Sequence, residues 1–314
     1  MNTHIAPILE EARRAPSVLN SQPWRFRVCG NTIEVYLEKK PELEEVDPKG
    51  RLQTASCGTL IAHLEKSITK RGLTPKITFF PRFEEPDLVA FIETIGASVK
   101  SVKQEPEVLL SGEKDRSSTG TANQNQESSD ALHDLRTTLS ELAALKEVGL
   151  MVHDDSSDRS IHTYLRNNCG EKLKSEYFRK SLNLYLRTDV SDNAVPFEDE
   201  ALLSDRFFDA EPIASSGQEL KVEDLFMILT TGTDNRFEWT RAGQVLGEII
   251  MELRKWENIG LMALPIISND CCRAWLKEKL DLSGYPQFVL KMKPDKPKEH
   301  VRKRPLQDLL KYRF

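Results

Sequence analysis

The chain has 314 residues, of which 39% are hydrophobic and 30% charged, a composition typical of a globular protein large enough for about two domains. Its net charge of −5 argues against nucleic acid as a general partner, and its longest mostly apolar run, residues 260–267, is too short to span a bilayer. Five cysteines without CxxC spacing, and an N-terminus without a basic segment leading into an apolar one, favour a cytoplasmic protein.

The apolar pattern of the N-terminal third predicts a compact α+β unit. A stripe of apolar residues at helical spacing lies between Ile5 and Ala12, and Pro16 ends that helix. Alternating apolar residues on either side of a Gly-Asn turn indicate a β-hairpin. In chain order we expect a helix over 5–12, a hairpin over 26–37, a long helix over 52–72, and strands over 76–81 and 88–95.

The composition changes after the first of these units. Residues 98–130 are polar, low in aromatics and without periodicity, which predicts a flexible linker. Residues 189–224 contain eleven acidic and two basic residues, which predicts a long solvated excursion that covers another part of the protein. The other expected elements are a helix from 132, a strand over 149–155, a helical region ending near 178, strands over 182–189 and 224–232, a long helix over 241–256 and a last strand over 285–292.

The two long helices share a pattern that suggests an internal repeat. Segments 56–73 and 241–261 each carry a glycine near the start of an apolar-striped helix and end in Gly-Leu. This pattern predicts two related halves that pack as an intramolecular pseudo-dimer around long central helices. The expected domains are residues 1–98 and residues 99–314, the second of which contains the acidic cover.

Common catalytic and metal-binding motifs are missing from the sequence. It has no GxGxxG, GxxxxGK[ST], HExxH or GxSxG motif, and its six histidines are scattered. His63 lies close to the apolar stripe of the first long helix, where we expect a semi-buried histidine with satisfied hydrogen bonds rather than a ligand or a base. Cys271 and Cys272 are expected on a half-buried helix, with a redox-active pair as the alternative. The sequence predicts no metal site and no catalytic side chain.

The segment APSVLNSQPWRF, residues 15–26, carries the clearest functional signal. Pro16 turns the chain out of the first helix, and a second proline forces an extended entry into the next strand, where Trp24 anchors the core. Between the two prolines, Asn20 and Gln22 carry both donors and acceptors. Composition alone leaves two interpretations open: a loop that binds a flat heterocycle, or a loop whose amides only cap and anchor the loop itself.

The same segment resembles the flavin-contacting loop of the nitroreductase family, which has the form AxxAPSxxNxQPWxF. The positions that agree are Ala15, Pro16, Ser17, Asn20, Gln22, Pro23, Trp24 and Phe26. Residues 47–73 and the C-terminal stretch from 285 resemble the longer, single-chain Acg-like branch of that family. The resemblance implies a nitroreductase-like α+β fold with one FMN bound where the two halves of the chain meet.

The resemblance also implies which residues contact the flavin ring. They are Pro16, Ser17, Val18, Asn20 and Gln22. The first three would face the ring, where backbone amides set the electronics near its N5 atom. Asn20 would touch the flavin directly or nearly so, whereas Gln22 would mainly hold the shape of the loop.

The second half would bind the FMN phosphate. The resemblance implies Arg116 and Ser118, from an RxSxR-like segment, and the late basic pair Arg302 and Arg304. Guanidinium groups match phosphate oxygens bidentately, and a serine hydroxyl can donate to one. Gly120 stands where the family segment has its second basic residue, so one phosphate contact is expected to be missing. The alternative for the late pair is a solvated basic tail.

The implied function is that of an FMN-dependent NAD(P)H oxidoreductase that passes a hydride through the flavin to an electron-poor acceptor, a nitroaromatic or a quinone. The alternatives are a flavin-binding or storage protein whose covered FMN turns over little, and an interaction module that has lost the flavin. The expected partners are FMN, NAD(P)H and a small acceptor, with neither nucleic acid nor membrane. Fusion of the halves favours a monomer or a weak homodimer. The sequence selects neither the acceptor nor one of the two nicotinamides.

Overall fold

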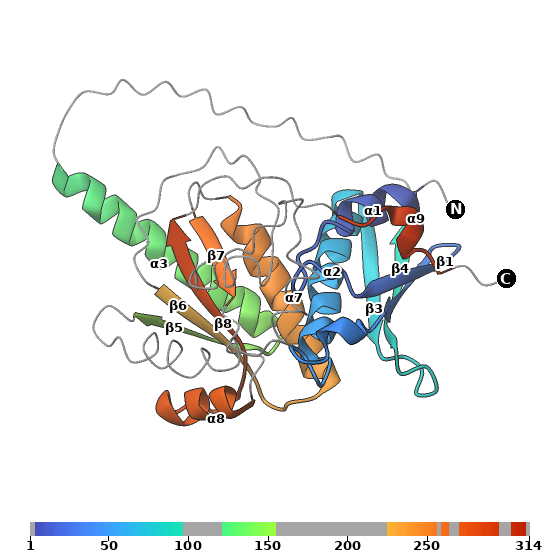
Figure 1. Cartoon of the computed structure of the whole chain (residues 1–314). Helices are drawn as coiled ribbons and strands as arrows, with labels where there is room; N and C mark the ends of the chain where they lie inside the picture. The colour runs from blue at the N-terminus through green and yellow to red at the C-terminus, as the bar shows by residue number, and fades with distance from the viewer. Residues whose placement is uncertain are drawn as a thin grey trace, which may run out of the picture.

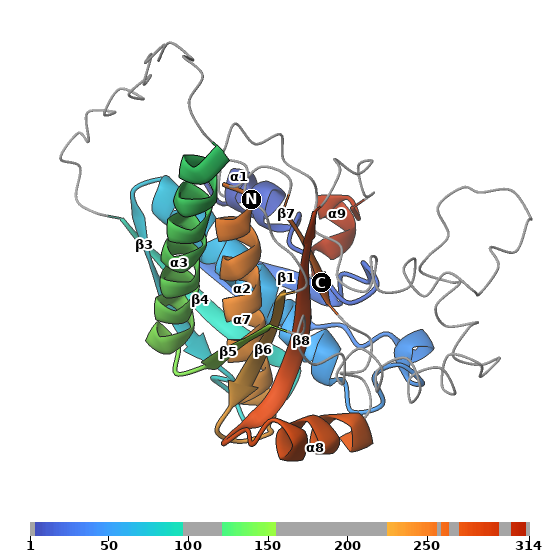
Figure 2. The same ribbon diagram turned by 90° about the vertical axis from the view of Figure 1, so that its left-hand side faces the viewer.

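Two mixed helix-and-sheet halves make up the described part of the protein (Figure 1). The computed structural model describes residues 4–96, 121–154, 225–255, 259–263, 270–294 and 303–311. The long helices α2 and α7 lie between the two sheets, and α7 also contacts α3, so that the three helices follow one another across the molecule (Figure 2). The expected α+β class is confirmed.

The first half has the chain order helix, two strands, helix, two strands. Its elements are α1 (Ile5–Ala12), β1 (Trp24–Cys29), β2 (Thr32–Leu37), the short 3-10 helix η1 (Pro41–Leu43), α2 (Arg51–Lys70), β3 (Leu73–Phe79) and β4 (Leu88–Gly96). The strands form an antiparallel sheet in the order β1-β2-β4-β3. The expected Gly-Asn turn joins β1 to β2, and Gly30 adopts the positive φ of 57° that such tight turns require.

The second half repeats this order, with the helix α8 added between its last two strands. Its elements are α3 (Thr121–Leu145), β5 (Gly149–Asp154), β6 (Leu225–Thr231), α7 (Arg236–Leu253), β7 (Ile259–Ala263), α8 (Asp270–Lys279) and β8 (Tyr285–Pro294). The sheet is again antiparallel, in the order β5-β6-β8-β7, so each strand takes the place of its counterpart in the first sheet. Both central strand pairs, β2 with β4 and β6 with β8, contain a register shift.

Several elements differ from the sequence prediction. The helix α3 begins at Thr121, so the expectation of a flexible linker is wrong for residues 121–130. This stretch has no apolar stripe, but extending a helix that is already packed costs little, because helix propagation is cooperative. The strand β7 was not predicted as a separate element. The half-buried helix expected at Cys271 and Cys272 is confirmed as α8, in which Cys271 is exposed and Cys272 is buried. The helical region near 178, the strand 182–189 and the acidic cover 189–224 lie outside the described residues.

The packing at the centre depends on glycines in α2 and α7. An ideal Cβ atom on Gly58 would overlap the carbonyl oxygen of Thr240 and lie 2.9 Å from the Cα atom of Gly243. A Cβ atom on Gly243 would in turn overlap the carbonyl oxygen of Ala55. Gly58 and Gly243 are 185 residues apart, as are Ala55 and Thr240, so the contact is reciprocal. Such reciprocity is the property of an interface between two equivalent surfaces.

Side chains from the first half enter the core of the second. Val18 and Leu19, which follow α1, are buried in the cluster that contains Phe226, Leu246 and Phe288. Leu43, Val46, Leu52 and Ala55 belong to the same cluster, whereas most other buried apolar residues of the first half form a separate cluster around α1, β1 and α2. The segment after α1 therefore crosses from one half to the other.

The C-terminal segment returns to the first half. Its helix α9 (Leu306–Leu309) lies against β1, and Leu310 pairs in parallel with Phe26 of that strand (Figure 1). The N–H of Lys311 donates to the carbonyl oxygen of Phe26 at 2.6 Å, and Leu309 is fully buried. This return brings Lys303 and Arg304 next to the segment that follows α1.

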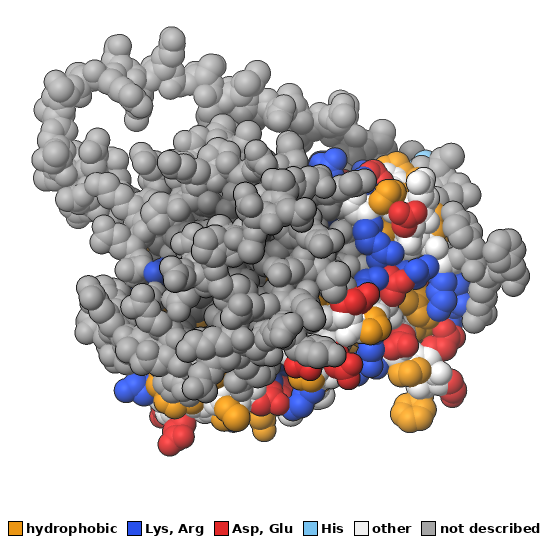
Figure 3. Space-filling view, in the orientation of Figure 1, with side chains coloured by type: hydrophobic (Ala, Val, Ile, Leu, Met, Phe, Trp, Pro, Cys, Tyr) orange, Lys and Arg blue, Asp and Glu red, His pale blue; other side chains and the backbone are white. Residues whose placement is uncertain are grey.

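The described surface in one view carries interspersed acidic and basic side chains over the first half (Figure 3). Within the described ranges, none of the helices combines the length and the apolar character needed to cross a bilayer.

Candidate functional site

The connection between α1 and β1 differs in length between the two halves. It consists of residues 13–23, eleven in all, whereas the equivalent connection between α3 and β5 has only residues 146–148, three in all. The longer connection, hereafter the seam loop, contains all the residues predicted to contact a flavin ring.

The backbone of the seam loop adopts an uncommon conformation. Leu19, Asn20 and Gln22 have φ values of 49°, 51° and 45°, which non-glycine residues seldom adopt. Two hydrogen bonds to Ser17 stabilise this conformation. Its hydroxyl oxygen accepts from the N–H of Gln22 at 3.0 Å, and its carbonyl accepts from the N–H of Asn20 at 3.0 Å. Strained backbone that the surroundings over-determine is common at binding sites.

One face of α2 supports the loop. The N–H of Val18 donates to the hydroxyl oxygen of Ser56 at 3.0 Å, and the hydroxyl of Thr59 donates to the carbonyl of Pro16 at 2.5 Å. Ser56 and Thr59 are three residues apart and therefore neighbours on one face of the helix. These bonds fix the first residues of the loop against the helix that contacts the second half.

The C-terminal basic segment, Lys303 and Arg304, also contacts the seam loop. The ammonium of Lys303 donates to the carbonyl of Ala15 at 3.3 Å and to the side-chain oxygen of Asn20 at 2.9 Å. The N–H of Arg304 donates to the side-chain oxygen of Gln22 at 2.8 Å. Residues almost three hundred positions apart in the sequence thus form one site.

Arg304 has further partners. Its guanidinium donates to the carbonyl of Gln22 at 3.1 Å and to the carboxylate of Glu38 at 2.9 Å, and it also reaches the carbonyl of Asp308 at 3.3 Å. It therefore ties the seam loop, the end of β2 and α9 together.

The carboxylate of Glu38 receives three cations. Burial raises the pKa of Glu38, but hydrogen bonds from Lys40, Arg25 and Arg304 outweigh burial and lower the pKa to about 2. Since the ordinary value is 4.5, the ionised carboxylate stabilises the fold above about pH 4.5, and this contribution is lost as the pH falls toward 2.

Replacement of this carboxylate should therefore weaken the fold in a pH-dependent way. We expect Glu38→Gln to lower the free energy of unfolding at pH 7, and we expect the difference from wild type to shrink at pH 3. Urea unfolding at both pH values measures it, with the exposed Glu84→Gln as the control. An equal difference at both pH values would show that the ion pairs of Glu38 are not its source.

No family model matches the chain. It is 26% identical, over 313 aligned positions, to "Putative NAD(P)H nitroreductase Rv3131" of Mycobacterium tuberculosis (strain ATCC 25618 / H37Rv), which covers 93% of this chain and 87% of that protein. In the same organism, "Putative NAD(P)H nitroreductase acg" is 33% identical over 89 residues, 28% of this chain and 27% of that protein. The chain is a relative of the Acg-like nitroreductases.

A further relative extends the similarity without adding a function. "Uncharacterized protein Rv3127" of the same organism is 24% identical over 301 positions, which cover 90% of this chain and 84% of that protein. Both long matches span most of this chain, so the similarity is not confined to the seam loop and the C-terminal segment that carry the recognisable motifs.

The structure brings together six of the nine residues predicted to bind FMN. They are Pro16, Ser17, Val18, Asn20, Gln22 and Arg304. The other three, Arg116, Ser118 and Arg302, lie outside the described residues. Sequence reasoning missed Ser56, Thr59 and Lys303. The two hydroxyls are unremarkable helix residues in sequence, but Lys303 lies between two predicted arginines and could have been included.

His63 differs from its sequence prediction. It is 7% exposed rather than semi-buried, and within the described part of the chain its Nε2 atom has no hydrogen-bond partner. The hydroxyl of Ser21 in the seam loop is also buried without a partner there. Buried polar atoms without hydrogen-bond partners are rare in proteins, so these two atoms indicate a partner other than the described protein groups. The expectation of a satisfied histidine is wrong because the helix supplies a partner for only one ring nitrogen.

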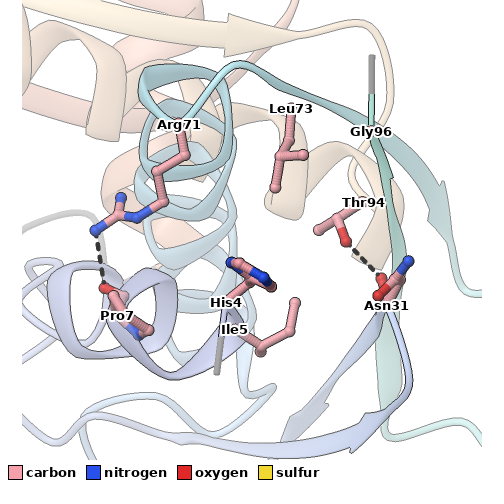
Figure 4. Close-up of a pocket in the computed structure, with 8 residues that line it drawn as sticks. All are labelled: His4, Ile5, Pro7, Asn31, Arg71, Leu73, Thr94 and Gly96. Atoms are coloured by element: carbon pink, nitrogen blue, oxygen red, sulfur yellow. Dashed lines mark hydrogen bonds between the residues drawn. The ribbon is translucent and has the colours of Figure 1, made fainter. Parts of the chain in front are cut away.

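A separate cavity lies away from the seam loop. It has a volume of about 420 Å³ and is lined by residues of α1, the β1–β2 turn, the start of β3 and the end of β4 (Figure 4). Its one arginine, Arg71, already donates to Glu11, Ser67 and the carbonyl of Pro7. Among the described side chains, no three His, Cys, Asp or Glu residues are grouped to hold a metal ion. The seam loop is therefore the better candidate site.

Proposed function

We propose that this chain binds one FMN between its two halves and passes a hydride from NAD(P)H through it to an electron-poor acceptor, a nitroaromatic or a quinone. The observation that carries the proposal is the junction of the seam loop, α2 and the basic C-terminal segment at one place. The names of the relatives, putative NAD(P)H nitroreductases, support the same class of reaction.

We also propose that the halves are related as the two subunits of a dimer. The support is the shared strand order of the two sheets and the reciprocal approach of Gly58 and Gly243. In a pair of equivalent halves two equivalent sites are possible. The second position has only a three-residue connection, and the ammonium of Lys146 there pairs with Glu65 at 3.3 Å and Glu248 at 3.1 Å. One site per chain follows.

The residues present fit an FMN. The cofactor combines a flat ring that needs polar and apolar contacts, a hydroxylated chain and an anionic phosphate. The seam offers the buried, unpartnered Nε2 of His63 and hydroxyl of Ser21, and the cation Lys303. Arg254, at the end of α7, is a second cation close enough to act electrostatically on His63. This donor and acceptor set suits a neutral polar ring with an anionic end.

Each residue has a proposed part in this arrangement. Pro16, Ser17 and Val18 hold the ring, while Val18 and Leu19 exclude water because they are buried in the core of the second half. The phosphate is held by cations of the second half, Lys303 and Arg254 together with Arg116, Ser118 and Arg302. The flavin, when bound, supplies the hydride chemistry itself, so no protein acid or base is required.

Two measurements on the purified protein test the proposal. Incubation with FMN should give a yellow protein after gel filtration, and anaerobic addition of NADPH or NADH should bleach it. Stopped-flow spectroscopy of the bleaching gives the rate with each nicotinamide. A yellow protein that neither nicotinamide bleaches would favour the storage alternative, whereas a protein that stays colourless after incubation would contradict FMN binding.

A further inference from the structure

The tautomer of His63 follows from its one hydrogen bond. Its Nδ1 atom lies 2.9 Å from the carbonyl oxygen of Thr59, and a carbonyl can only accept. Nδ1 therefore carries the proton, and Nε2 presents a lone pair. This lone pair is buried and has no partner within the described residues.

His63 belongs to the same face of α2 that holds the seam loop. It follows Thr59 by one helical turn, and Thr59 donates to the carbonyl of Pro16. Lys303, which binds Ala15 and Asn20 of the loop, also acts electrostatically on His63. The unpartnered nitrogen therefore lies beside the loop rather than in a remote part of the core.

At the position of α7 that corresponds to His63, the second half has a polar side chain with a partner. When the two long helices are aligned on Gly58 and Gly243, which meet at their crossing, the residue five positions later is His63 in α2 and Glu248 in α7. The carboxylate of Glu248 has a partner, the ammonium of Lys146 from the short connection, at 3.1 Å. In the first half, where the seam loop replaces the short connection, the corresponding polar atom is Nε2 of His63, which has no partner among the described residues.

The charges around His63 keep it neutral. Burial lowers the pKa of His63 to about 4; the bond to Thr59 opposes this, Arg254 and Lys303 lower the pKa further, and Glu11 of α1 raises it. The carboxylate of Glu11 is itself held by Arg71 and Ser67. At neutral pH the imidazole therefore has an acceptor at Nε2 and no proton to give to an anion.

We propose that Nε2 of His63 accepts a hydrogen bond from the riboflavin part of FMN, an inference that rests on the function proposed above. A neutral acceptor cannot bind the phosphate, which offers oxygens and no proton in its dianionic form. The cofactor has two kinds of donor: the N3–H of the ring and the hydroxyls of the ribityl chain. His63 is thus a binding residue from α2, in addition to those of the seam loop and the basic segments.

Replacements at His63 test this directly by fluorescence titration with FMN. His63→Leu should weaken FMN binding by about tenfold, because the cofactor donor is then left unpaired. His63→Gln should restore most of the affinity, since its amide oxygen reaches about as far as Nε2. His133→Leu, at an exposed position of α3, is the control. Thermal melting of the cofactor-free variants checks that each is folded.

The ligand used separates the two donors. If lumiflavin, which lacks the ribityl chain, is also bound more weakly by His63→Leu, the ring N–H is the donor. If only riboflavin and FMN are affected, a ribityl hydroxyl is the donor. Equal FMN affinity in wild type and His63→Leu would overturn the inference, as would a loss in His63→Gln as large as in His63→Leu.

A measurement on the wild-type protein does not depend on whether the variants fold. In protein labelled with ¹⁵N-histidine, the Nε2 signal of His63 should move upfield when FMN binds, as expected for a nitrogen that begins to accept a hydrogen bond. An unmoved signal at saturating FMN would overturn the inference. A wild-type protein that binds no FMN would instead contradict the proposed function, so the two failures are distinct.

Discussion

We expect Gly243→Ala to lower the midpoint of thermal unfolding by roughly 5 °C, which corresponds to about 3 kcal/mol for a chain of this size. The added methyl group would overlap the carbonyl oxygen of Ala55 and lie 2.7 Å from its carbonyl carbon. Both atoms belong to the backbone of α2, which cannot rotate away as a side chain can. The helices must separate, and the packing on both sides of the contact is lost.

A matched glycine provides the control for this substitution. Gly232 has no atom within 4 Å of an added Cβ and no positive φ, so Gly232→Ala should change stability by less than about 0.5 kcal/mol. Gly58→Ala should lower stability about as much as Gly243→Ala. The double variant should lose less free energy of unfolding than the two single variants together, because one separation of the helices relieves both overlaps. A Gly243→Ala protein that melts with wild type would contradict the close approach of α2 and α7.

Arg304→Ala is the second substitution with a large expected effect. The sequence resemblance predicts a phosphate contact for Arg304, but its described partners are Gln22, Glu38 and Asp308. We therefore expect the variant to weaken binding of FMN and of riboflavin by the same factor, about 10- to 100-fold, because the seam loop loses its charge-assisted anchor. Titration of each ligand by flavin fluorescence measures the two factors.

The comparison of FMN with riboflavin distinguishes the anchoring role of Arg304 from a phosphate contact. Riboflavin lacks the phosphate, so a loss confined to FMN would contradict the anchoring role and support the phosphate contact. Glu38→Gln should reproduce part of the loss for both ligands, since it removes one partner of Arg304. Arg14→Ala, an exposed arginine at the start of the seam loop, should leave both affinities unchanged.

Local patterns were sufficient to predict much of the first half. The stripe from Ile5 to Ala12, the hairpin turn at Gly30 and the apolar face of α2 each reflect contacts between residues close in sequence. The repeat of a glycine in two long helices also pointed to their contact. The structure adds that Gly58 and Gly243 are the residues at which the backbones meet.

Other parts of the site depend on contacts that no local pattern encodes. The pairing of Leu310 with Phe26 returns the C-terminus to the first half, where Lys303 donates to Asn20. Likewise, the sequence places His63 beside an apolar stripe but does not reveal that one ring nitrogen lacks a partner. Such features result from the tertiary arrangement, so they required the structure.

The stoichiometry of FMN binding tests the central claim most directly, namely a single site between unequal halves. Titration of FMN into cofactor-free protein at a concentration well above the dissociation constant should reach its end point at one FMN per chain. The seam loop has eleven residues, whereas the described connection between α3 and β5 in the second half has three. An end point at two FMN per chain would contradict the inequality of the halves, and the absence of any saturable binding would contradict the site itself.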